Sequence, residues 1–209
     1  MKKRTKEILA RFDEVYGTEP VCYLHYNTPW QLLVATMLSA QCTDDNVNRV
    51  TVGLFQKYDT LEKLAAADPV QLEQDIRSIG LFRSKAKNIL ATAGLLLSRH
   101  GGELPSDIDS LVALPGVGRK TANVVRTHIF KIPSVVVDTH VKRIAGKLKL
   151  TKEEDPVKIE HELMKEVDEA HWSLINTQFI AFGRAICQAR SPKCELCFVR
   201  DYCKEGKKR

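Results

Sequence analysis

The chain has 209 residues, of which 44% are hydrophobic and 28% are charged, a composition typical of soluble globular proteins with one or two domains. No apolar run approaches the roughly 18 residues of a membrane span. The basic N-terminus also lacks the apolar core and the cleavage site of a secretion signal. We therefore expect a cytoplasmic protein without a membrane partner.

Positive charge is concentrated in two parts of the chain, whose net charge is +6. From Gly116 to Leu150 a single acid, Asp138, stands among eight basic residues: Arg119, Lys120, Arg126, Lys131, Lys142, Arg143, Lys147 and Lys149. The C-terminal part contains seven more: Arg190, Lys193, Arg200, Lys204, Lys207, Lys208 and Arg209. Such blocks favour a polyanionic partner, with nucleic acid as the leading candidate, although a solvated basic face has the same composition.

Helical signals begin at the N-terminus and dominate the chain. The first 17 residues predict an amphipathic helix of the mature protein. Thr28 is a plausible N-cap, and Pro29 takes the first helical position of an almost wholly apolar run. We expect this second helix to be buried.

The same pattern continues to the C-terminal part of the chain. Asp44 and Asp45 are cap candidates for a helix that ends near Tyr58. Apolar periodicity predicts further helices over 61–67, 68–80, 81–101, 105–114, 155–167 and 171–187. The β-branched run Val135–Val137 is too short for more than an extended connector. The sequence therefore predicts an all-α fold.

The stretch "LPGVGRKTANVV", Leu114–Val125, joins two predicted helices by a tight turn. A Walker A loop has four residues between its glycines and follows a strand. Here one residue separates Gly116 from Gly118, and the preceding segment is helical, so a nucleotide-binding loop is excluded. The backbone N–H groups at the start of the second helix predict a phosphate site. An ordinary connection that needs glycine for positive φ is the alternative.

Lys120 falls in the first turn of that second helix, an unfavourable position for a cation, next to Arg119. Partial burial would disfavour the charged form further. Nucleophilic lysine chemistry requires a neutral amine, so Lys120 is a candidate nucleophile. The alternative is a surface lysine that only adds to the basic patch.

Asp138 follows the extended connector and precedes a predicted helix. The apolar residues of that helix share one face: Val141, Ile144, Ala145 and Leu148. Asp is a preferred N-cap, so a structural role is a strong interpretation. Asp138 is also the single acid of a basic segment, and a carboxylate near Lys120 could stabilise a cationic sugar and help to move protons. The spacing of the two residues does not establish that they are close.

Four cysteines stand near the C-terminus with six, two and five residues between them: Cys187, Cys194, Cys197 and Cys203. In a chain without a secretion signal this density predicts a metal site rather than disulfides. A zinc site and an iron–sulfur cubane are both chemically open, and the single loop favours the cluster. Cys22 and Cys42 are predicted to be small core residues.

Taken together, these motifs resemble the endonuclease III family of DNA repair glycosylases. The cysteine loop, "LPGVGRKTA" and "VDTHV" occur in the order of that family, and "LSAQCTD" and "SIGLFRSKA" are similar to two further signatures. The resemblance implies two all-helical lobes with a DNA-binding cleft between them. One lobe would be a six-helix bundle over 21–133 that contains a helix-hairpin-helix element at the glycine turn. The other would combine 1–20 with 134–209 and hold a [4Fe–4S] cluster in the loop 187–203.

The resemblance also implies an activity, the removal of oxidised pyrimidines from double-stranded DNA and cleavage of the strand by β-elimination at the abasic site. Lys120 would form a Schiff base with the sugar, and Asp138 would be its catalytic partner. The target base must leave the stack, and Gln41 would enter the gap with Leu81 as an apolar wedge beside it. From the sequence alone a core leucine is the better interpretation of Leu81.

Two loops are expected to contact DNA phosphates without reading bases. One is the glycine turn with Gly116, Gly118 and Arg119. The other is the cysteine loop, where Arg190 and Lys193 lie between the first two ligands. We expect a monomer that associates with the nucleoid through its DNA binding.

Two alternative functions remain open at this level. A non-catalytic nucleic-acid-binding module with a zinc site would have the same basic turns. The adenine-excising branch of the same superfamily lacks a lysine at this position and carries an extra C-terminal domain. This chain has Lys120 and ends six residues after Cys203, which argues against that branch.

Overall fold

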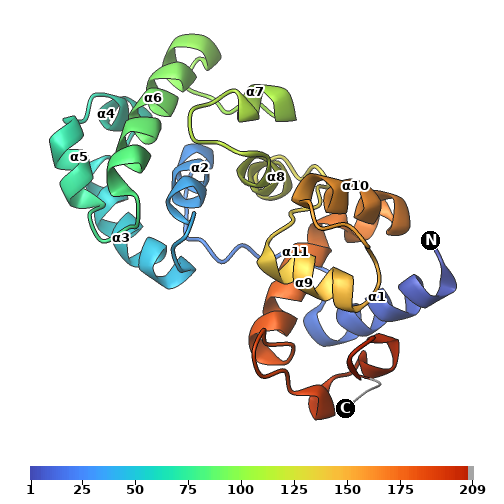
Figure 1. Cartoon of the computed structure of the whole chain (residues 1–209). Coiled ribbons are helices and arrows are strands. Elements are labelled where there is room, and N and C mark those ends of the chain that lie inside the picture. The colour runs from blue at the N-terminus through green and yellow to red at the C-terminus, as the bar shows by residue number, and fades with distance from the viewer. Residues whose placement is uncertain (207–209) are drawn as a thin grey trace. The chain divides into compact units, whose positions relative to one another are not determined.

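The computed structural model describes residues 1–206 of the chain. These residues form eleven α-helices and two short 3₁₀ helices and include no β-strand, which confirms the all-α prediction (Figure 1). None of the described helices is long and apolar enough to cross a membrane. Lys207, Lys208 and Arg209 of the C-terminal basic set lie outside the described residues.

The chain divides into two compact units that do not follow each other in sequence. Unit 1 consists of Met1–Val21 and Ile132–Arg209, and unit 2 consists of Cys22–Lys131. Unit 2 is thus an insertion between the first helix and the C-terminal helices of unit 1. Each unit has its own buried apolar core.

Unit 2, all of which the structure describes, has seven helices. They are α2 (Pro29–Leu38), α3 (Asp44–Lys57), α4 (Leu61–Ala65), α5 (Pro69–Asp75), α6 (Phe82–His100), α7 (Ile108–Val112) and α8 (Arg119–His128). This is one helix more than the bundle implied by the resemblance. The separation of α5 from α4 agrees with the helices predicted over 61–67 and 68–80, because Asp68 accepts a hydrogen bond from the Gln71 amide at 2.8 Å and Pro69 starts α5.

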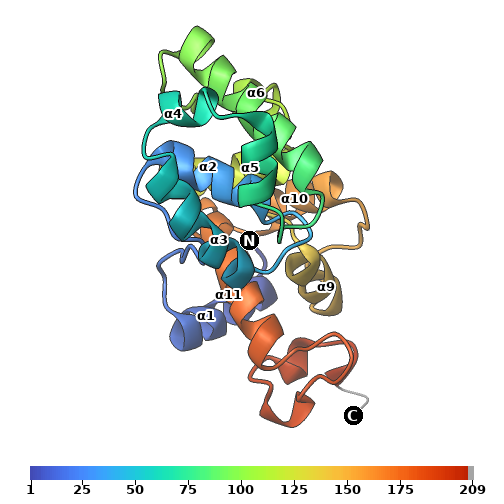
Figure 2. The same cartoon turned by 90° about the vertical axis from the view of Figure 1, so that its left-hand side faces the viewer.

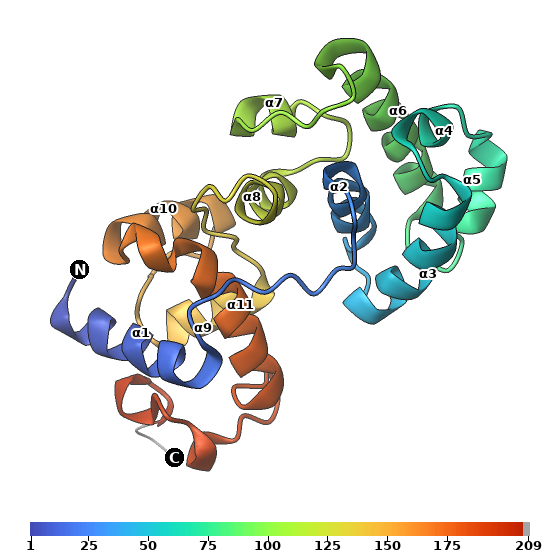
Figure 3. The same ribbon diagram turned by 180° about the vertical axis from the view of Figure 1, so that it is seen from behind.

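Helix α2 is the central element of unit 2. Every residue from Trp30 to Leu38 is buried, and α2 packs against α3, α6 and α8 (Figure 3). Its start has the predicted form, since Pro29 takes the first helical position after Thr28. The Gln31 side chain accepts hydrogen bonds from the amides of Asn27 and Thr28. Because α2 is buried on all sides, the backbone polar groups at both of its ends must find hydrogen-bond partners within the protein.

The described part of unit 1, which ends at residue 206, is built from four α-helices and the cysteine loop. Its elements are α1 (Lys3–Tyr16), α9 (Thr139–Lys147), α10 (Pro156–Glu166), α11 (Glu169–Ala185) and the 3₁₀ turns η1 (Cys194–Leu196) and η2 (Arg200–Tyr202). Figure 2 shows the cysteine loop continuing from the end of α11. The Phe12 ring of α1 lies 4.8 Å from Phe179, 5.1 Å from Phe182 and 5.1 Å from Phe198, measured between centroids. This aromatic cluster joins both ends of the chain to the loop.

The segment before α9 is the extended connector that the sequence predicts. Residues 131–138 form neither helix nor strand, and Val135 and Val136 are buried. The next helix buries the predicted face, because Val141, Ile144 and Ala145 have no exposed surface. The connector therefore delivers Asp138 to the start of a well-anchored helix.

Candidate functional site

The glycine turn of unit 2 connects α7 to α8 and is fixed by apolar and polar contacts. Leu114 and Val117 are buried, and the Val117 amide donates to the Leu114 carbonyl at 3.1 Å. Thr92 of α6 donates its hydroxyl to the Pro115 carbonyl at 2.9 Å. These contacts on its buried side therefore fix the turn, while Gly116 and Gly118 remain exposed.

Gly116 and Gly118 have different tasks in this turn. Gly116 has φ +75°, and a Cβ added to it would lie 2.7 Å from the Asn88 side chain. Gly118 has φ −90° and is the N-cap of α8, without a side chain to satisfy the first amides of the helix. The first-turn amides of an α-helix have no intrahelical acceptor, so this helix start suits an anion.

Lys120 is the second residue of α8, as the sequence predicts. Its side chain is exposed, so the partial burial considered above is absent. The α8 start therefore presents an accessible amine at one side of the glycine turn. Position in the hairpin, rather than burial, distinguishes this lysine from other surface lysines.

Asp138 is the N-cap of α9 and is half-buried. Its Oδ1 accepts a hydrogen bond from the Val141 amide at 2.8 Å, which confirms the structural interpretation. The cap uses one of the two carboxylate oxygens and fixes the direction of the group. Asp138 belongs to unit 1 and Lys120 to unit 2.

Two further candidate residues, Gln41 and Leu81, lie on adjacent loops of unit 2. Both have left-handed backbone conformations, with φ 56° at Gln41 and φ 60° at Leu81, although neither is glycine. Both side chains are exposed, and Leu81 retains 61% of its surface. The interpretation of Leu81 as a core leucine is therefore wrong. Strained backbone and exposed apolar surface together are typical of a binding position.

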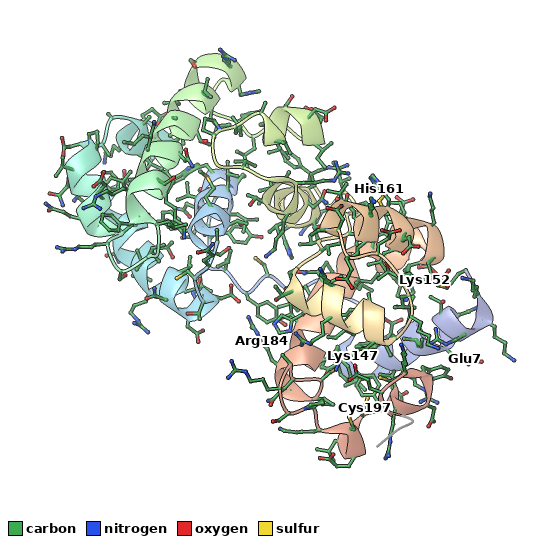
Figure 4. All side chains as sticks on the ribbon, viewed as in Figure 1. Glu7, Lys147, Lys152, His161, Arg184 and Cys197 are labelled. Carbon is green, nitrogen blue, oxygen red and sulfur yellow. The ribbon has the colours of Figure 1, made fainter. Side chains whose placement is uncertain are left out.

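The four C-terminal cysteines line a single pocket in unit 1. Lys147, Lys193 and Arg200 also line this pocket (Lys147 and Cys197 are labelled in Figure 4). All four cysteines are free and half-buried. Burial raises the pKa of the Cys187 thiol, and the charges of Lys147 and Arg143 act in the opposite direction.

The donor set of this pocket fits an iron–sulfur cluster. Within residues 1–206 no group of three or more His, Cys, Asp or Glu side chains is arranged to hold a single metal ion. Four cysteine thiols nevertheless line the same pocket. Four cysteine thiols that line one pocket are the donor set of a cubane, in which each cysteine would bind a separate iron. Arg190 and Lys193 are exposed on this loop.

Several other cations of the basic segments make hydrogen bonds or ion pairs within the protein. Arg143 of α9 donates to the Cys187 carbonyl at 2.9 Å. Lys142 pairs with Glu154 at 2.7 Å, and Lys147 pairs with Glu205 at 2.7 Å. Counting charges in the sequence does not separate these residues from cations that remain available for a ligand.

Comparison with known proteins gives matches along nearly the whole chain. Residues 34–169 match the family model described as HhH-GPD superfamily base excision DNA repair protein. Residues 187–203 match the iron-sulfur binding domain of endonuclease III. Endonuclease III of Bacillus subtilis is 48% identical over 90% of this chain and 86% of its own length. Endonuclease III of Synechocystis is 47% identical over 97% and 92%.

The chain is a member of the endonuclease III family.

A solved structure supports the same assignment at the level of the fold. It is described as a trapped endonuclease III–DNA covalent intermediate in an estranged-adenine complex, and it is 42% identical to this chain. The TM-score is 0.92, and the match covers 100% of this chain and 99% of the other. As an endonuclease III family member, this chain is a base-excision DNA glycosylase and AP lyase that binds DNA and carries a [4Fe–4S] cluster.

Sequence reasoning missed the residues that support the site from α6. Asn88 lies against Gly116, Thr92 holds Pro115, and Lys85 contacts the loop of Gln41. Their spacing of three to four residues places them near one side of α6, which was a usable signal. Their polar chemistry gave no indication that they face the core.

Proposed function

We propose that Lys120 is the nucleophile of this glycosylase and AP lyase and that Asp138 assists it. The observation that carries the proposal is the exposed amine of Lys120 at the start of α8. It lies next to a glycine turn of the kind that suits a phosphate. A protein 42% identical to this chain is described as a covalent intermediate with DNA. Covalent attachment to DNA requires a nucleophile, and an amine can form a Schiff base with a sugar.

In the proposed reaction the amine nitrogen of Lys120 attacks C1′ of the damaged nucleotide. The glycosidic bond breaks, the base leaves with a proton, and the opened sugar forms a Schiff base with the lysine. Loss of a C2′ proton then breaks the C3′–O bond and cuts the strand. Asp138 offers a directed carboxylate that stabilises positive charge on the sugar and accepts or returns protons.

The substrate of the proposed reaction is an oxidised pyrimidine or an abasic site in double-stranded DNA. The base must leave the helix stack before C1′ becomes accessible. Gln41 and Leu81 are proposed to enter the gap that it leaves. An exposed leucine next to an exposed amide suits this task, because the wedge is apolar and the opposite base needs a polar partner.

Phosphate contacts are assigned to the two basic loops. Gly116, Gly118 and Arg119 would hold one phosphate at the start of α8. Arg190 and Lys193 would hold another from the cysteine loop. Cys187, Cys194, Cys197 and Cys203 would bind the [4Fe–4S] cluster, which stiffens this loop when bound. We further propose that the protein acts as a monomer at the nucleoid.

A panel of duplexes with single lesions tests the proposed function. Wild-type protein should excise oxidised pyrimidines and cut the strand, whereas Lys120→Gln should bind the same duplexes and leave the strand intact. Lys87→Gln removes an exposed lysine of α6 and serves as the matched control, with wild-type cleavage. Undiminished strand cleavage by Lys120→Gln would overturn the assignment.

A further inference from the structure

Lys85 is a buried lysine in the first turns of α6 and retains 7% of its surface. Its Nζ donates to the Leu38 carbonyl at 2.9 Å and to the Ala40 carbonyl at 2.6 Å. Buried lysines are rare unless their charge is compensated. The proposed chemistry makes no use of this residue, so its contacts require another explanation.

The environment of the Lys85 ammonium is the C-terminal end of α2. Leu38 is the last residue of that buried helix, and its carbonyl has no intrahelical partner. A cation at this end also meets the negative end of the helix dipole. Burial lowers the pKa of Lys85, while the nearby Cys42 acts in the opposite direction. Lys85 therefore replaces the capping function that solvent performs at an exposed helix end.

The loop after α2 carries Gln41, and Lys85 holds this loop at the residue directly before Gln41. Ala40, whose carbonyl accepts from Lys85, directly precedes Gln41 with its φ of 56°. Leu81 is the N-cap of α6, and its carbonyl accepts the Lys85 amide at 3.0 Å. The bond to Leu81 is the first backbone hydrogen bond of α6, whereas the Lys85 side chain reaches across to the residue before Gln41.

Asn46 of α3 makes a second connection between the same two loops. Its Nδ2 lies 3.2 Å from the Cys42 Sγ and donates to the Ser78 carbonyl at 3.2 Å. The two loops also approach directly, since a Cβ on Gly80 would lie 3.8 Å from the Gln41 carbonyl oxygen. Loops 39–42 and 77–81 therefore form one connected unit.

We propose that Lys85 and Asn46 are positioning residues that hold Gln41 and Leu81 at a fixed separation for entry into the DNA gap. This inference rests on the gap-filling role in the proposed function. Both residues would act through the backbone of these loops. Because both loops are already ordered in the free protein, base flipping does not require a further loss of their conformational entropy.

The first test compares Lys85→Met with Lys87→Met. Methionine keeps the length of the side chain and removes the donors, whereas Lys87 is exposed on the same helix. Circular dichroism and thermal unfolding establish that each variant is folded. Single-turnover excision of an oxidised pyrimidine should fall roughly 10- to 100-fold in Lys85→Met, the scale of a positioning error. Excision by Lys87→Met should equal the wild type.

A second measurement separates positioning from a general loss of structure. A duplex with 2-aminopurine opposite the lesion reports entry into the gap through its fluorescence. Lys85→Met should give a smaller fluorescence change at saturating protein. Its DNA affinity should stay within about threefold, because the phosphate-binding turns are unchanged.

A double-mutant cycle gives the sharpest test. If Lys85 acts through the Gln41 loop, Lys85→Met should have little further effect on excision in a Gln41→Ala background. Asn46→Ala, which leaves the core intact, should show the same dependence on Gln41 and covers the case in which Lys85→Met does not fold. Additive effects of these variants with Gln41→Ala would overturn the proposal. Wild-type protein without excision would instead overturn the proposed function.

Discussion

Gly116 meets two requirements that exclude every residue with a Cβ. Its φ of +75° is strained for L-residues, and the Asn88 side chain fills the space where a Cβ would lie. Gly118, two residues later, has an ordinary φ and open space around it. The same amino acid therefore serves the fold at Gly116, whereas at Gly118 we propose that it allows the close approach of a phosphate.

Gly116→Ala and Gly118→Ala should separate these two roles. We expect Gly116→Ala to lower the free energy of unfolding by about 2–3 kcal/mol, from backbone strain and the clash with Asn88. Gly118→Ala should cost less than about 1 kcal/mol, because only a weak cap preference is lost. Gly118→Ala should nevertheless weaken DNA binding, since its methyl group meets the approaching phosphate. Urea unfolding and DNA titration check both; equal stability of the two variants would contradict this distinction.

At the scale of elements, a network of polar side chains joins α1 to α11. His171 Nε2 lies 2.9 Å from the Asp13 carboxylate, and Nδ1 contacts Asp168. Gln178 of α11 donates to the other Asp13 oxygen at 2.9 Å. Burial opposes protonation of His171, but the hydrogen bonds to Asp168 and Asp13 outweigh it, so the pKa of His171 is raised.

The raised pKa of His171 predicts a pH dependence of unit 1. The stabilisation is fully present below the unfolded-state pKa of about 6.5 and is lost as pH rises through the folded-state pKa. Unfolding in urea, followed through Trp172 of α11 in a Trp30→Phe background, should show lower stability at about pH 9 than at about pH 5.5. His171→Gln should flatten this dependence, whereas His161→Gln, at an exposed position of α10, should preserve it. A pH dependence that survives His171→Gln would refute this interpretation.

The elements that could be predicted from the sequence are those with local signals. Pro29 and Asp138 mark helix starts through capping chemistry, and Val141 and Ile144 mark a buried face through spacing. Local pattern alone gave the wrong environment for Leu81, which is exposed at the N-cap of α6 with a left-handed backbone, and only the family resemblance pointed to a wedge.

The burial of Lys85 was equally hidden from sequence reasoning. It follows from where the end of α2 lies, a tertiary fact without a local signature. For the same reason the sequence could identify Arg143 only as one more cation, although it binds the Cys187 carbonyl. Motifs and the family resemblance thus pointed to the candidate site residues, whereas the groups that support them required the fold.

At the scale of the whole molecule, the two proposed catalytic residues come from different units. Lys120 stands on unit 2, and Asp138 and the cysteine loop stand on unit 1. The cysteine loop is joined to its unit by Phe198, whose ring packs on Phe12 and Phe182, and by the Arg143 contact. Loss of the cluster should therefore impair unit 1 and leave the lysine hairpin of unit 2 in place.

Cys197→Ser tests this division of labour. We expect loss of iron and of the yellow-brown colour, with weaker DNA binding and a smaller salt dependence, because the phosphate contacts of Arg190 and Lys193 lose their fixed support. Cys22→Ser, outside the cysteine pocket, should keep the iron content of the wild type. Iron content per chain and DNA affinity at several salt concentrations provide the measurement. Stoichiometric zinc without iron in the wild type would contradict the cluster assignment.

The most direct test of Lys120 as the nucleophile is reductive trapping. Wild-type protein, incubated with a duplex that contains one oxidised pyrimidine, should form a covalent adduct on addition of borohydride, since reduction makes a Schiff base permanent. Peptide mapping should place the adduct on Lys120, and Lys120→Gln should bind the duplex and give none. An adduct on another residue, or equal trapping by Lys120→Gln, would contradict the proposed mechanism.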